Sequence, residues 1–199
     1  MIGVYMQTKK EIRKELLLRR DALNEKEQLR AEILITERIL GHQWFYRSDI
    51  ILGFMSYGSE IRTGQLLEEA LRKGKRVYLP RVEGEEMNFY RIEGASEDLE
   101  RTDNFGLVSG YHGIPEPSGH TERYRYSEED ELKSLILMPG VGFDPYRNRL
   151  GYGKGFYDRF LADKPGLQIR SIAIGHQCQM VESLPADERD IKPYQVILV

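Results

Sequence analysis

The sequence predicts an α/β fold of three layers, α/β/α, with a mainly parallel sheet covered by helices on both faces. The alternation of two kinds of segment supports this prediction. Short apolar segments that are typical of buried strands alternate along the chain with segments of helical periodicity, and such alternation is characteristic of parallel sheets. The length of 199 residues suits one domain without a linker. We therefore expect a single domain over residues 1–199, with a helical segment at 1–45 and an α/β body at 46–199.

Two helices are predicted before the first strand. A capping box at residues 8–11 (Thr-Lys-Lys-Glu) opens a helix that ends near residue 23, and residues 24–27 (Asn-Glu-Lys-Glu) repeat the device. The second helix ends near residue 42. Its inward-facing residues are expected to be Leu29, Ile33, Ile39 and Leu40.

The body begins with a buried strand at residues 49–55, then a loop, and then a helix that Thr63 caps and Gly74 ends. Further strands are predicted at residues 77–80, 87–92, 135–138, 171–174 and 195–199. Between residues 93 and 130 the chain is rich in Gly, Pro, Ser and charge. A loop of this length in a compact domain is usually a functional lid or a mobile insertion.

The most informative segment is residues 138–161, MPGVGFDPYRNRLGYGKGFYDRFL. A glycine-dense loop follows the buried strand, carries Arg147, Arg149 and Lys154, and leads into a helix near Gly155. A strand followed by a cationic glycine loop and a helix is an arrangement that binds phosphate, because the backbone N–H groups and the positive end of the helix face the anion. A tight structural turn is the alternative interpretation.

This loop matches neither of two familiar nucleotide motifs. A Walker loop would need glycine at Asn148 and Ser or Thr at Gly155, and a dinucleotide fingerprint would need glycine at Phe156.

The segments PGVGFD and RLGYGKGFYD resemble the signature of the 5-formyltetrahydrofolate cyclo-ligase family, also called 5,10-methenyltetrahydrofolate synthetases. The resemblance implies the sheet topology shared by ribose-phosphate isomerases and CoA transferases. It also implies ATP- and Mg²⁺-dependent conversion of 5-formyltetrahydrofolate to 5,10-methenyltetrahydrofolate, with release of ADP and phosphate. The folate substrate would carry one glutamate or a polyglutamate tail. In that reaction the formyl oxygen is phosphorylated, N10 closes the ring and no protein nucleophile is needed.

The same resemblance implies which residues bind ATP. They lie on the first helix, where Lys-Lys-Glu-Ile-Arg at 9–13 is similar to the family's nucleotide-contacting segment, and on the glycine loop. From the residues alone, the cations at 9–13 would be a solvated basic face. The implied ATP contacts are Lys9, Lys10, Arg13, Arg149, Leu150, Gly151, Tyr152, Gly153, Lys154, Gly155, Phe156 and Tyr157. The expected catalytic residues are Arg149, Lys154 and Tyr157.

Substrate contacts are expected from the same loop and from the turn at residues 56–63, at the carboxyl edge of the sheet where α/β folds bind ligands. Arg62 departs from the family pattern, which often has an acidic or amide residue there, and Arg can only donate hydrogen bonds. The expected substrate contacts are Tyr57, Glu60, Tyr152, Gly153, Lys154, Gly155 and Phe156.

Asp158 and Asp190 fall at the family's magnesium positions, and two carboxylates suit a Mg²⁺ ion that also binds phosphates. As a first-turn acid, Asp158 could instead only complement the helix dipole. Arg189 and Tyr194 stand where the family commonly has His and Asp. Asp144 is interpreted as a turn former.

Histidines and the single cysteine point to no further site. The four histidines (42, 112, 120 and 176) lack zinc-type spacing, so surface or loop roles are expected, and Cys178 is expected to be a small, at least partly buried residue.

Composition limits the remaining function classes. The net charge of −3, from 29 basic and 32 acidic residues, argues against nucleic-acid binding. No apolar run could span a bilayer and no signal-peptide pattern begins the sequence, so we expect a cytoplasmic protein without a membrane partner. A monomer or weak dimer is expected. The alternatives are a sugar-phosphate isomerase or CoA transferase-like enzyme of the same fold and, second, a non-catalytic RNA- or protein-binding module.

Overall fold

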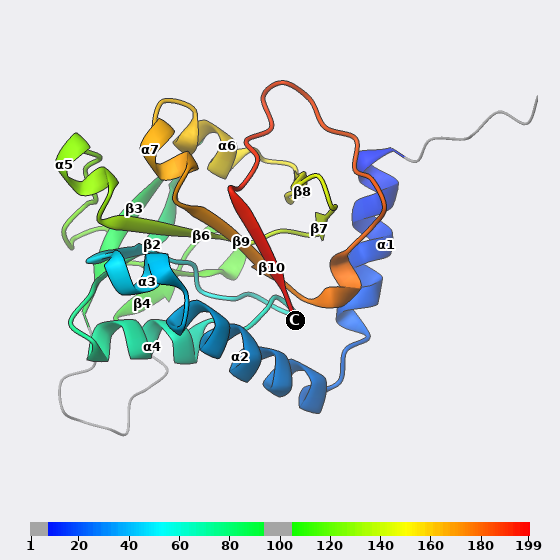
Figure 1. The fold of residues 1–199 in the computed structure, drawn as a ribbon, viewed down its shortest axis with the longest axis horizontal. Helices are drawn as coiled ribbons and strands as arrows, with labels where there is room; N and C mark the ends of the chain where they lie inside the picture. Colours follow the sequence, from blue (N-terminus) through cyan, green and yellow to red (C-terminus); the bar gives the residue numbers. More distant parts are fainter. Residues whose placement is uncertain (1–7, 94–104) are drawn as a thin grey trace, which may run out of the picture.

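The structure, a computed structural model, describes residues 8–93 and 105–199 and is built on a six-stranded sheet (Figure 1). The strand order is β10-β9-β6-β1-β2-β3, and every neighbouring pair is parallel except the antiparallel pair β2–β3. The strands are β1 (Ile50–Leu52), β2 (Arg76–Glu83), β3 (Glu86–Ile92), β6 (Ser134–Met138), β9 (Ser171–Gly175) and β10 (Gln195–Leu198). The prediction of a mainly parallel sheet is confirmed.

Helices cover both faces of this sheet. On one face lie α2 (Glu25–Leu40), α3 (Gln43–Arg47) and α4 (Gly64–Arg72), and on the other lie α6 (Phe156–Leu161) and α7 (Pro165–Gln168). Successive strand residues alternate between the layers: Ile51 packs with α2 and α4, whereas Ile50 and Leu52 pack with α6 and α7. This alternation confirms the three-layer α/β/α architecture.

The first helix, α1 (Lys9–Asp21), does not join either helical layer and packs at the end of the molecule against β7 (Gly142–Phe143) (Figure 1). The predicted capping box at Thr8 is present. The buried residues Ile12 and Leu16 form a small separate core with Val141, Leu150 and Leu184. Because Val141 and Leu150 flank the glycine loop, this core fixes α1 beside that loop.

The expected inward face of α2 is partly wrong. Ile39 is fully buried and Leu40 is partly buried, but Leu29 is 51% exposed and Ile33 is 43% exposed. The stripe that packs against the sheet and α4 has the spacing i, i+4, i+8 and consists of Ala31, Ile35 and Ile39. The neighbouring stripe through Leu29 and Ile33 faces outward because only one side of the helix meets the sheet layer.

Two further expectations in the first half of the body need correction. Thr63 occupies the N-cap position of α4, but its hydroxyl donates to the Phe54 carbonyl at 2.6 Å and does not cap the helix. The strand predicted at residues 77–80 extends to Glu83, because β2 and β3 form a hairpin whose turn contains Gly84 at φ 66°.

The stretch expected to be an irregular loop contains short elements where it is described; residues 94–104 lie outside the described part. These elements are β4 (Leu107–Ser109), a 3₁₀ turn η1 (Tyr111–Gly113), β5 (Pro115–Pro117) and α5 (Glu128–Glu131). The backbone of Tyr124 also donates to Phe89 of β3 at 2.8 Å. This stretch therefore extends the outer edge of the sheet. Within residues 8–93 and 105–199, no helix has the length and apolar character needed to cross a membrane.

Candidate functional site

The glycine loop is presented by a short antiparallel ribbon that follows β6. The ribbon consists of β7 and β8 (Arg149–Leu150), and the turn between them is closed by Asp144. The buried Asp144 carboxylate accepts hydrogen bonds from the backbone of Tyr146 and Asn148, from the Asn148 side chain and from the backbone of Leu184. The interpretation of Asp144 as a turn former is confirmed.

Glycines at 151 and 153 allow two guanidinium groups to lie directly over the loop backbone. A Cβ atom on Gly153 would lie 3.4 Å from the guanidinium carbon of Arg13, and one on Gly151 would lie 3.1 Å from Nη1 of Arg149. Arg13 Nε also donates to the Gly151 carbonyl at 2.7 Å. Gly153 and Gly155 have φ values of 98° and 66°, a region that favours glycine. The loop thus carries two converging cations that any larger residue would disturb.

The three cations of the loop itself point in different directions. The Lys154 side chain is exposed and has no hydrogen-bonding or ionic partner in the described part of the chain, although the Lys154 carbonyl accepts from Arg159 at 2.7 Å. Arg147 donates instead to the Tyr194 carbonyl at 2.7 Å, on the segment before β10. Of these three residues, Arg149 and Lys154 remain available to an anion at the loop together with Arg13 from α1, and the sequence-based grouping is wrong for Arg147.

Arg149 is held in a buried ion pair at the start of α6. Its Nη2 lies 3.0 Å from Asp158 Oδ1, and the two side chains are 4% and 21% exposed. Its Nη1 donates to the Pro139 carbonyl at 3.3 Å, and its guanidinium lies 5.6 Å from the Tyr157 ring centroid. Arg149 Nε is buried without a partner among the described residues. Such an unsatisfied donor beside an open loop is a feature that a bound oxygen ligand would satisfy.

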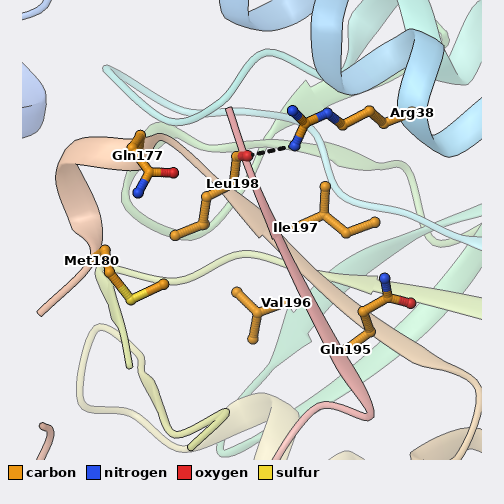
Figure 2. A pocket seen from close by; sticks show the side chains of 7 residues that line it. All are labelled: Arg38, Gln177, Met180, Gln195, Val196, Ile197 and Leu198. Atoms are coloured by element: carbon orange, nitrogen blue, oxygen red, sulfur yellow. Dashed lines mark hydrogen bonds between the residues drawn. The ribbon is translucent and has the colours of Figure 1, made fainter. Parts of the chain in front are cut away.

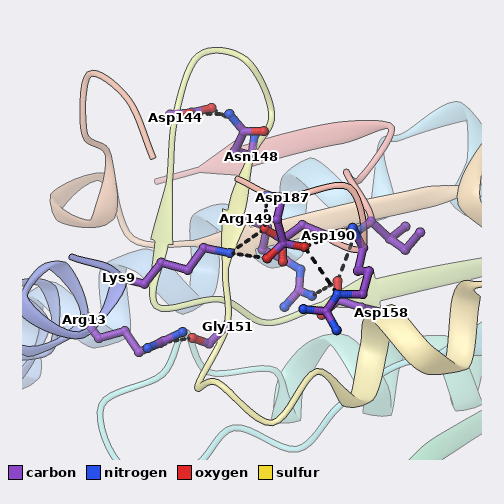
Figure 3. A network of polar contacts seen from close by, with 11 residues as sticks. Lys9, Arg13, Asp144, Asn148, Arg149, Gly151, Asp158, Asp187 and Asp190 are labelled. Carbon is purple, nitrogen blue, oxygen red and sulfur yellow. Dashed lines mark hydrogen bonds and ion pairs between the residues drawn. The ribbon is translucent and has the colours of Figure 1, made fainter. Parts of the chain in front are cut away.

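The other predicted magnesium ligand, Asp190, lies at the same corner (Figure 3). Lys9 Nζ is 2.6 Å from Asp190 and 3.2 Å from Asp187, so Lys9 contacts the acidic segment and not the glycines. The Ile191 backbone donates to Asp158 Oδ1 at 3.1 Å, which brings Asp190 and Asp158 together. Burial acts to lower the pKa of Lys9, but hydrogen bonds to Asp190 and Asp187 outweigh it and raise the pKa.

Two carboxylates at one corner fit a magnesium ion that is completed by phosphate oxygens. In the described residues there is no cluster of three or more acidic, histidine or cysteine side chains for a metal. Mg²⁺ commonly binds through only one or two carboxylates together with substrate phosphates. Asp158 and Asp190 would provide that donor set. Lys9 and Arg149, which pair with these two carboxylates, would then share them with the metal.

Glu60 is the centre of the second group of predicted residues. It is only 7% exposed, accepts a hydrogen bond from the Tyr152 hydroxyl at 2.6 Å and another from the Tyr57 backbone at 2.9 Å. Burial raises the pKa of Glu60, against the opposing effect of these bonds. The Tyr57 side chain is about half exposed and its hydroxyl donates to the His112 carbonyl at 3.3 Å. The glycine loop and the residue 57–60 turn therefore meet at Tyr152.

Aromatic residues stand at the start of α6, next to the glycine loop. Tyr157 is buried, burial raises the pKa of its hydroxyl, and that hydroxyl has no partner in the part of the chain that is described. Phe156 is half-buried and stands edge-on to Tyr111 of η1 with ring centroids 5.8 Å apart. Helix α6 has only six residues, so its dipole is small and side chains with loop amides must supply most of the attraction for an anion.

The remaining predicted residues do not present free side chains to the loop in the same way. Leu150 is buried against α1 and offers only its backbone, whose carbonyl accepts from Val141 at 2.7 Å. The Lys10 side chain is exposed, without a hydrogen-bonding or ionic partner among the residues described. Arg62, which departs from the family pattern, points toward α2 and not toward the glycine loop. Its guanidinium pairs with Glu25 on α2 at 2.7 Å through both terminal nitrogens.

Sequence reasoning missed three residues of this region. Arg20 and His176 are 4% and 3% exposed; His176 lies in a loop, as one of the two expected roles had it, but it is buried there and not on the surface. The spacing Ile12, Leu16, Arg20 was a signal for Arg20, since it extends the buried stripe of α1. Tyr111 lies in the patternless stretch and left no signal. Cys178 is partly buried, as expected.

Two surface hollows lie away from the glycine loop. One of about 470 Å³ runs beside the edge strand β10, where the charged lining residue Arg38 already donates to the Leu198 carbonyl at 2.8 Å (Figure 2). The other, of about 360 Å³, lies between β3 and α6 and is lined by Arg123, Arg125 and Lys164 among others. Neither brings together the residues of the glycine loop and the Glu60 turn.

Comparison with known proteins identifies relatives over almost the whole chain. The model of the 5-formyltetrahydrofolate cyclo-ligase family matches residues 5–199. The 5-formyltetrahydrofolate cyclo-ligase of Mus musculus is 29% identical over 194 residues, covering 95% of this chain and 92% of the relative. That of Escherichia coli K12 is 31% identical over 180 residues, covering 87% and 90%.

Solved structures give the same result. The 5,10-methenyltetrahydrofolate synthetase of Aquifex aeolicus is similar with a TM-score of 0.75 and 33% identity, covering 94% of this chain and 87% of that one. The synthetase of Mycoplasma pneumoniae, at 21% identity, shares the fold with a TM-score of 0.65 over 96% and 98% of the two chains.

Proposed function

Because this chain belongs to the 5-formyltetrahydrofolate cyclo-ligase family and is thus an enzyme of the ligase class, we propose that it converts 5-formyltetrahydrofolate to 5,10-methenyltetrahydrofolate. ATP would be the co-substrate and Mg²⁺ the metal, with ADP and phosphate as the other products. The observation that carries the nucleotide part is the placement of the Arg13 and Arg149 guanidinium groups over the backbone of Gly151 and Gly153.

The phosphates would lie on the glycine loop between α1 and α6. Guanidinium groups bind phosphate oxygens through paired donors, and lysine adds a mobile point charge. Arg13 and Arg149 are fixed by the Gly151 carbonyl and by Asp158. The ammonium group of Lys154 is unpaired among the described residues, so it can follow the transferred phosphoryl group. Phosphoryl transfer depends chiefly on such positioning and charge neutralisation.

Asp158 and Asp190 would hold the metal ion. When bound, Mg²⁺ would neutralise phosphate charge and orient the phosphates. Lys9 and Arg149 have a supporting role in this proposal, because they hold the two carboxylates at one corner before the metal arrives.

The folate would lie against the Glu60 turn and the aromatic residues of α6. Each Glu60 oxygen accepts one protein hydrogen bond, which leaves lone pairs for the N–H groups of a pterin edge. Tyr57 and Phe156 offer exposed ring surface beside it. The unpartnered Tyr157 hydroxyl would donate to the formyl oxygen, which is the catalytic contact proposed for Tyr157.

The reaction balances without a covalent enzyme intermediate. The formyl oxygen attacks the γ-phosphorus and releases ADP, which converts a poor leaving group into a phosphate ester. The N10 nitrogen then bonds to the formyl carbon and loses its proton, and the carbon–oxygen bond breaks to release inorganic phosphate. Arg149, Lys154 and Arg13 would offset the negative charge that spreads over the transferring group.

The test is direct. Purified protein is mixed with 5-formyltetrahydrofolate, ATP and Mg²⁺, and the methenyl product is followed by absorbance while ADP and phosphate are counted. One ADP and one phosphate per product support the proposal. Product without ATP, or release of AMP, contradicts it. An isomerase or CoA transferase of the same fold would require no ATP, and the family match gives it no support. Cytoplasmic location, polyglutamylated substrate and a monomeric or weakly dimeric state remain parts of this proposal.

A further inference from the structure

The buried stripe of α1 ends in a charged residue. Ile12 and Leu16 fill the small core under the helix, but the next residue of the same stripe is Arg20, which is 4% exposed. Arginine is almost never buried to this extent without partners, because burial of an unpaired charge is costly. The partners of Arg20 therefore indicate why the helix carries it there.

Arg20 contacts both halves of the proposed site. Its Nη1 donates to the Tyr152 hydroxyl at 2.9 Å, on the glycine loop, and its Nε donates to the Ser59 hydroxyl at 2.9 Å, in the Glu60 turn. Its guanidinium carbon lies 5.8 Å from the Tyr152 ring centroid. Within the described residues Arg20 forms no direct ion pair with a carboxylate.

The charge of Arg20 reaches a carboxylate through one hydroxyl group. The Tyr152 hydroxyl accepts from Arg20 and donates its own proton to Glu60 Oε1 at 2.6 Å. Glu60 Oε2 is fixed by the Tyr57 backbone. This places a buried cation, a tyrosine hydroxyl and a buried carboxylate in one chain, although the three residues come from α1, the glycine loop and the turn after β1.

We propose that Arg20 is a positioning residue which, through the Tyr152 hydroxyl, holds Glu60 oriented and ionised for N–H donors of the folate ring. This inference rests on the proposed function. Without these hydrogen bonds from Arg20 through Tyr152, burial would favour the neutral form of the Glu60 carboxyl, because the low-dielectric surroundings oppose its charge. A neutral or rotated Glu60 would offer one fewer acceptor to the ring.

The role differs from that of Arg13 on the same helix. Arg13 precedes Arg20 by two helical turns and lies over Gly153, where the phosphates are proposed to bind. Loss of the hydrogen bonds that connect Arg20 to Glu60 through Tyr152 should therefore weaken folate binding and leave nucleotide binding unchanged. A purely structural role for Arg20 would change both together.

The experiment compares Arg20→Met, Tyr152→Phe and the double variant in steady-state kinetics with each substrate varied. We expect each single change to raise the KM for 5-formyltetrahydrofolate by roughly 10- to 100-fold, the range for a lost hydrogen bond to a charged group. The KM for ATP should stay at the wild-type value. Because Arg20 acts through Tyr152, the double variant should be no worse than Tyr152→Phe.

Controls separate this from a folding defect. Arg19→Met removes the neighbouring arginine, which is exposed and pairs with Glu15, and should leave both KM values unchanged. Arg20→Lys keeps a charged donor and should recover part of the folate affinity. Tyr152→Phe removes a single oxygen from a half-exposed residue, so it tests the inference even if Arg20→Met does not fold.

Any of three results would overturn the inference. The Tyr152→Phe variant could keep the wild-type KM for 5-formyltetrahydrofolate, or the effects of the two substitutions could multiply in the double variant. The KM for ATP could also rise as much as the KM for the folate. Calorimetric titration with 5-formyltetrahydrofolate distinguishes its failure from that of the proposed function. If wild-type protein makes no product but binds the folate, the same variants are compared by Kd, and unchanged values overturn the role of Arg20. If wild-type protein neither binds nor converts the folate, both fail.

Discussion

Replacing Lys154 with alanine is expected to abolish turnover while the fold stays intact. The Lys154 side chain is exposed and makes no hydrogen bond or ion pair in the described part of the protein, so the folded state loses little when it is removed. Its place on the loop between Gly153 and Gly155 lets the ammonium group reach the position proposed for the transferred phosphoryl. Stability and activity should therefore respond differently to one substitution.

The expected loss follows from the charge and the surroundings. Two unit charges about 4 Å apart interact by about 4 kcal/mol at an effective dielectric constant of about 20, a value suited to a partly open site. If this attraction is realised in the transition state, its loss lowers the rate roughly a thousandfold. The free energy of unfolding should change by less than about 0.5 kcal/mol, as for surface substitutions in general.

Initial rates of methenyl formation at saturating folate, together with urea denaturation, measure both quantities. Lys73→Ala is the matched control, since Lys73 is an exposed lysine at the end of α4, on the opposite helical layer, and its loss changes the net charge equally. Turnover by Lys154→Ala at the level of Lys73→Ala would refute the assignment of the loop as the phosphoryl site. A large fall in stability would refute the reasoning from exposure.

Arg149→Ala should behave differently from Lys154→Ala: it should lose activity and also about 1–3 kcal/mol of unfolding free energy in chemical denaturation, because Asp158 would keep a poorly exposed charge without its partner. Arg147→Ala, which removes a cation turned toward Tyr194, should leave activity unchanged and serves as its control. Asp158→Asn should raise the Mg²⁺ concentration needed for half-maximal activity in a titration at fixed ATP, since one of two anionic ligands is lost; an unchanged Mg²⁺ dependence would remove Asp158 from the metal site. Burial lowers the pKa of His176 from 6.5 to about 4, so the unfolded chain takes up this proton first and stability falls as pH drops. Relative to His176→Gln, wild-type protein should lose about 3 kcal/mol of unfolding free energy between pH 6.5 and pH 4, and parallel pH curves for the two proteins would contradict this.

Local sequence patterns predicted most of the elements but not their limits. The capping box at Thr8 and the apolar strand at residues 135–138 depend on neighbours in the chain, and both are present. The face of α2 was predicted less well, since Leu29 and Ile33 fit a helical stripe as well as Ala31 and Ile35 do. Which stripe is buried depends on where the helix meets the sheet, and periodicity alone does not contain that information.

The candidate site shows the same division. The family pattern located the loop and its glycines, because the glycines that allow close approach to the backbone lie near one another in the sequence. It could not show that Arg147 turns toward Tyr194 or that Arg62 pairs with Glu25, since these contacts span 47 and 37 residues. Arg20 was missed for the same reason: its partners Tyr152 and Ser59 are 132 and 39 residues away.

By itself, the order of residues determined that a glycine-rich, cationic loop follows a buried strand, and the family to which this loop belongs. The tertiary structure decided which cations face that loop. Packing of Leu16 against Val141 and Leu150 brings α1 to the loop and with it Arg13 and Arg20. The physical reason is that side-chain charge is a local property of the sequence, whereas its direction is set by contacts that exist only once distant segments have packed together.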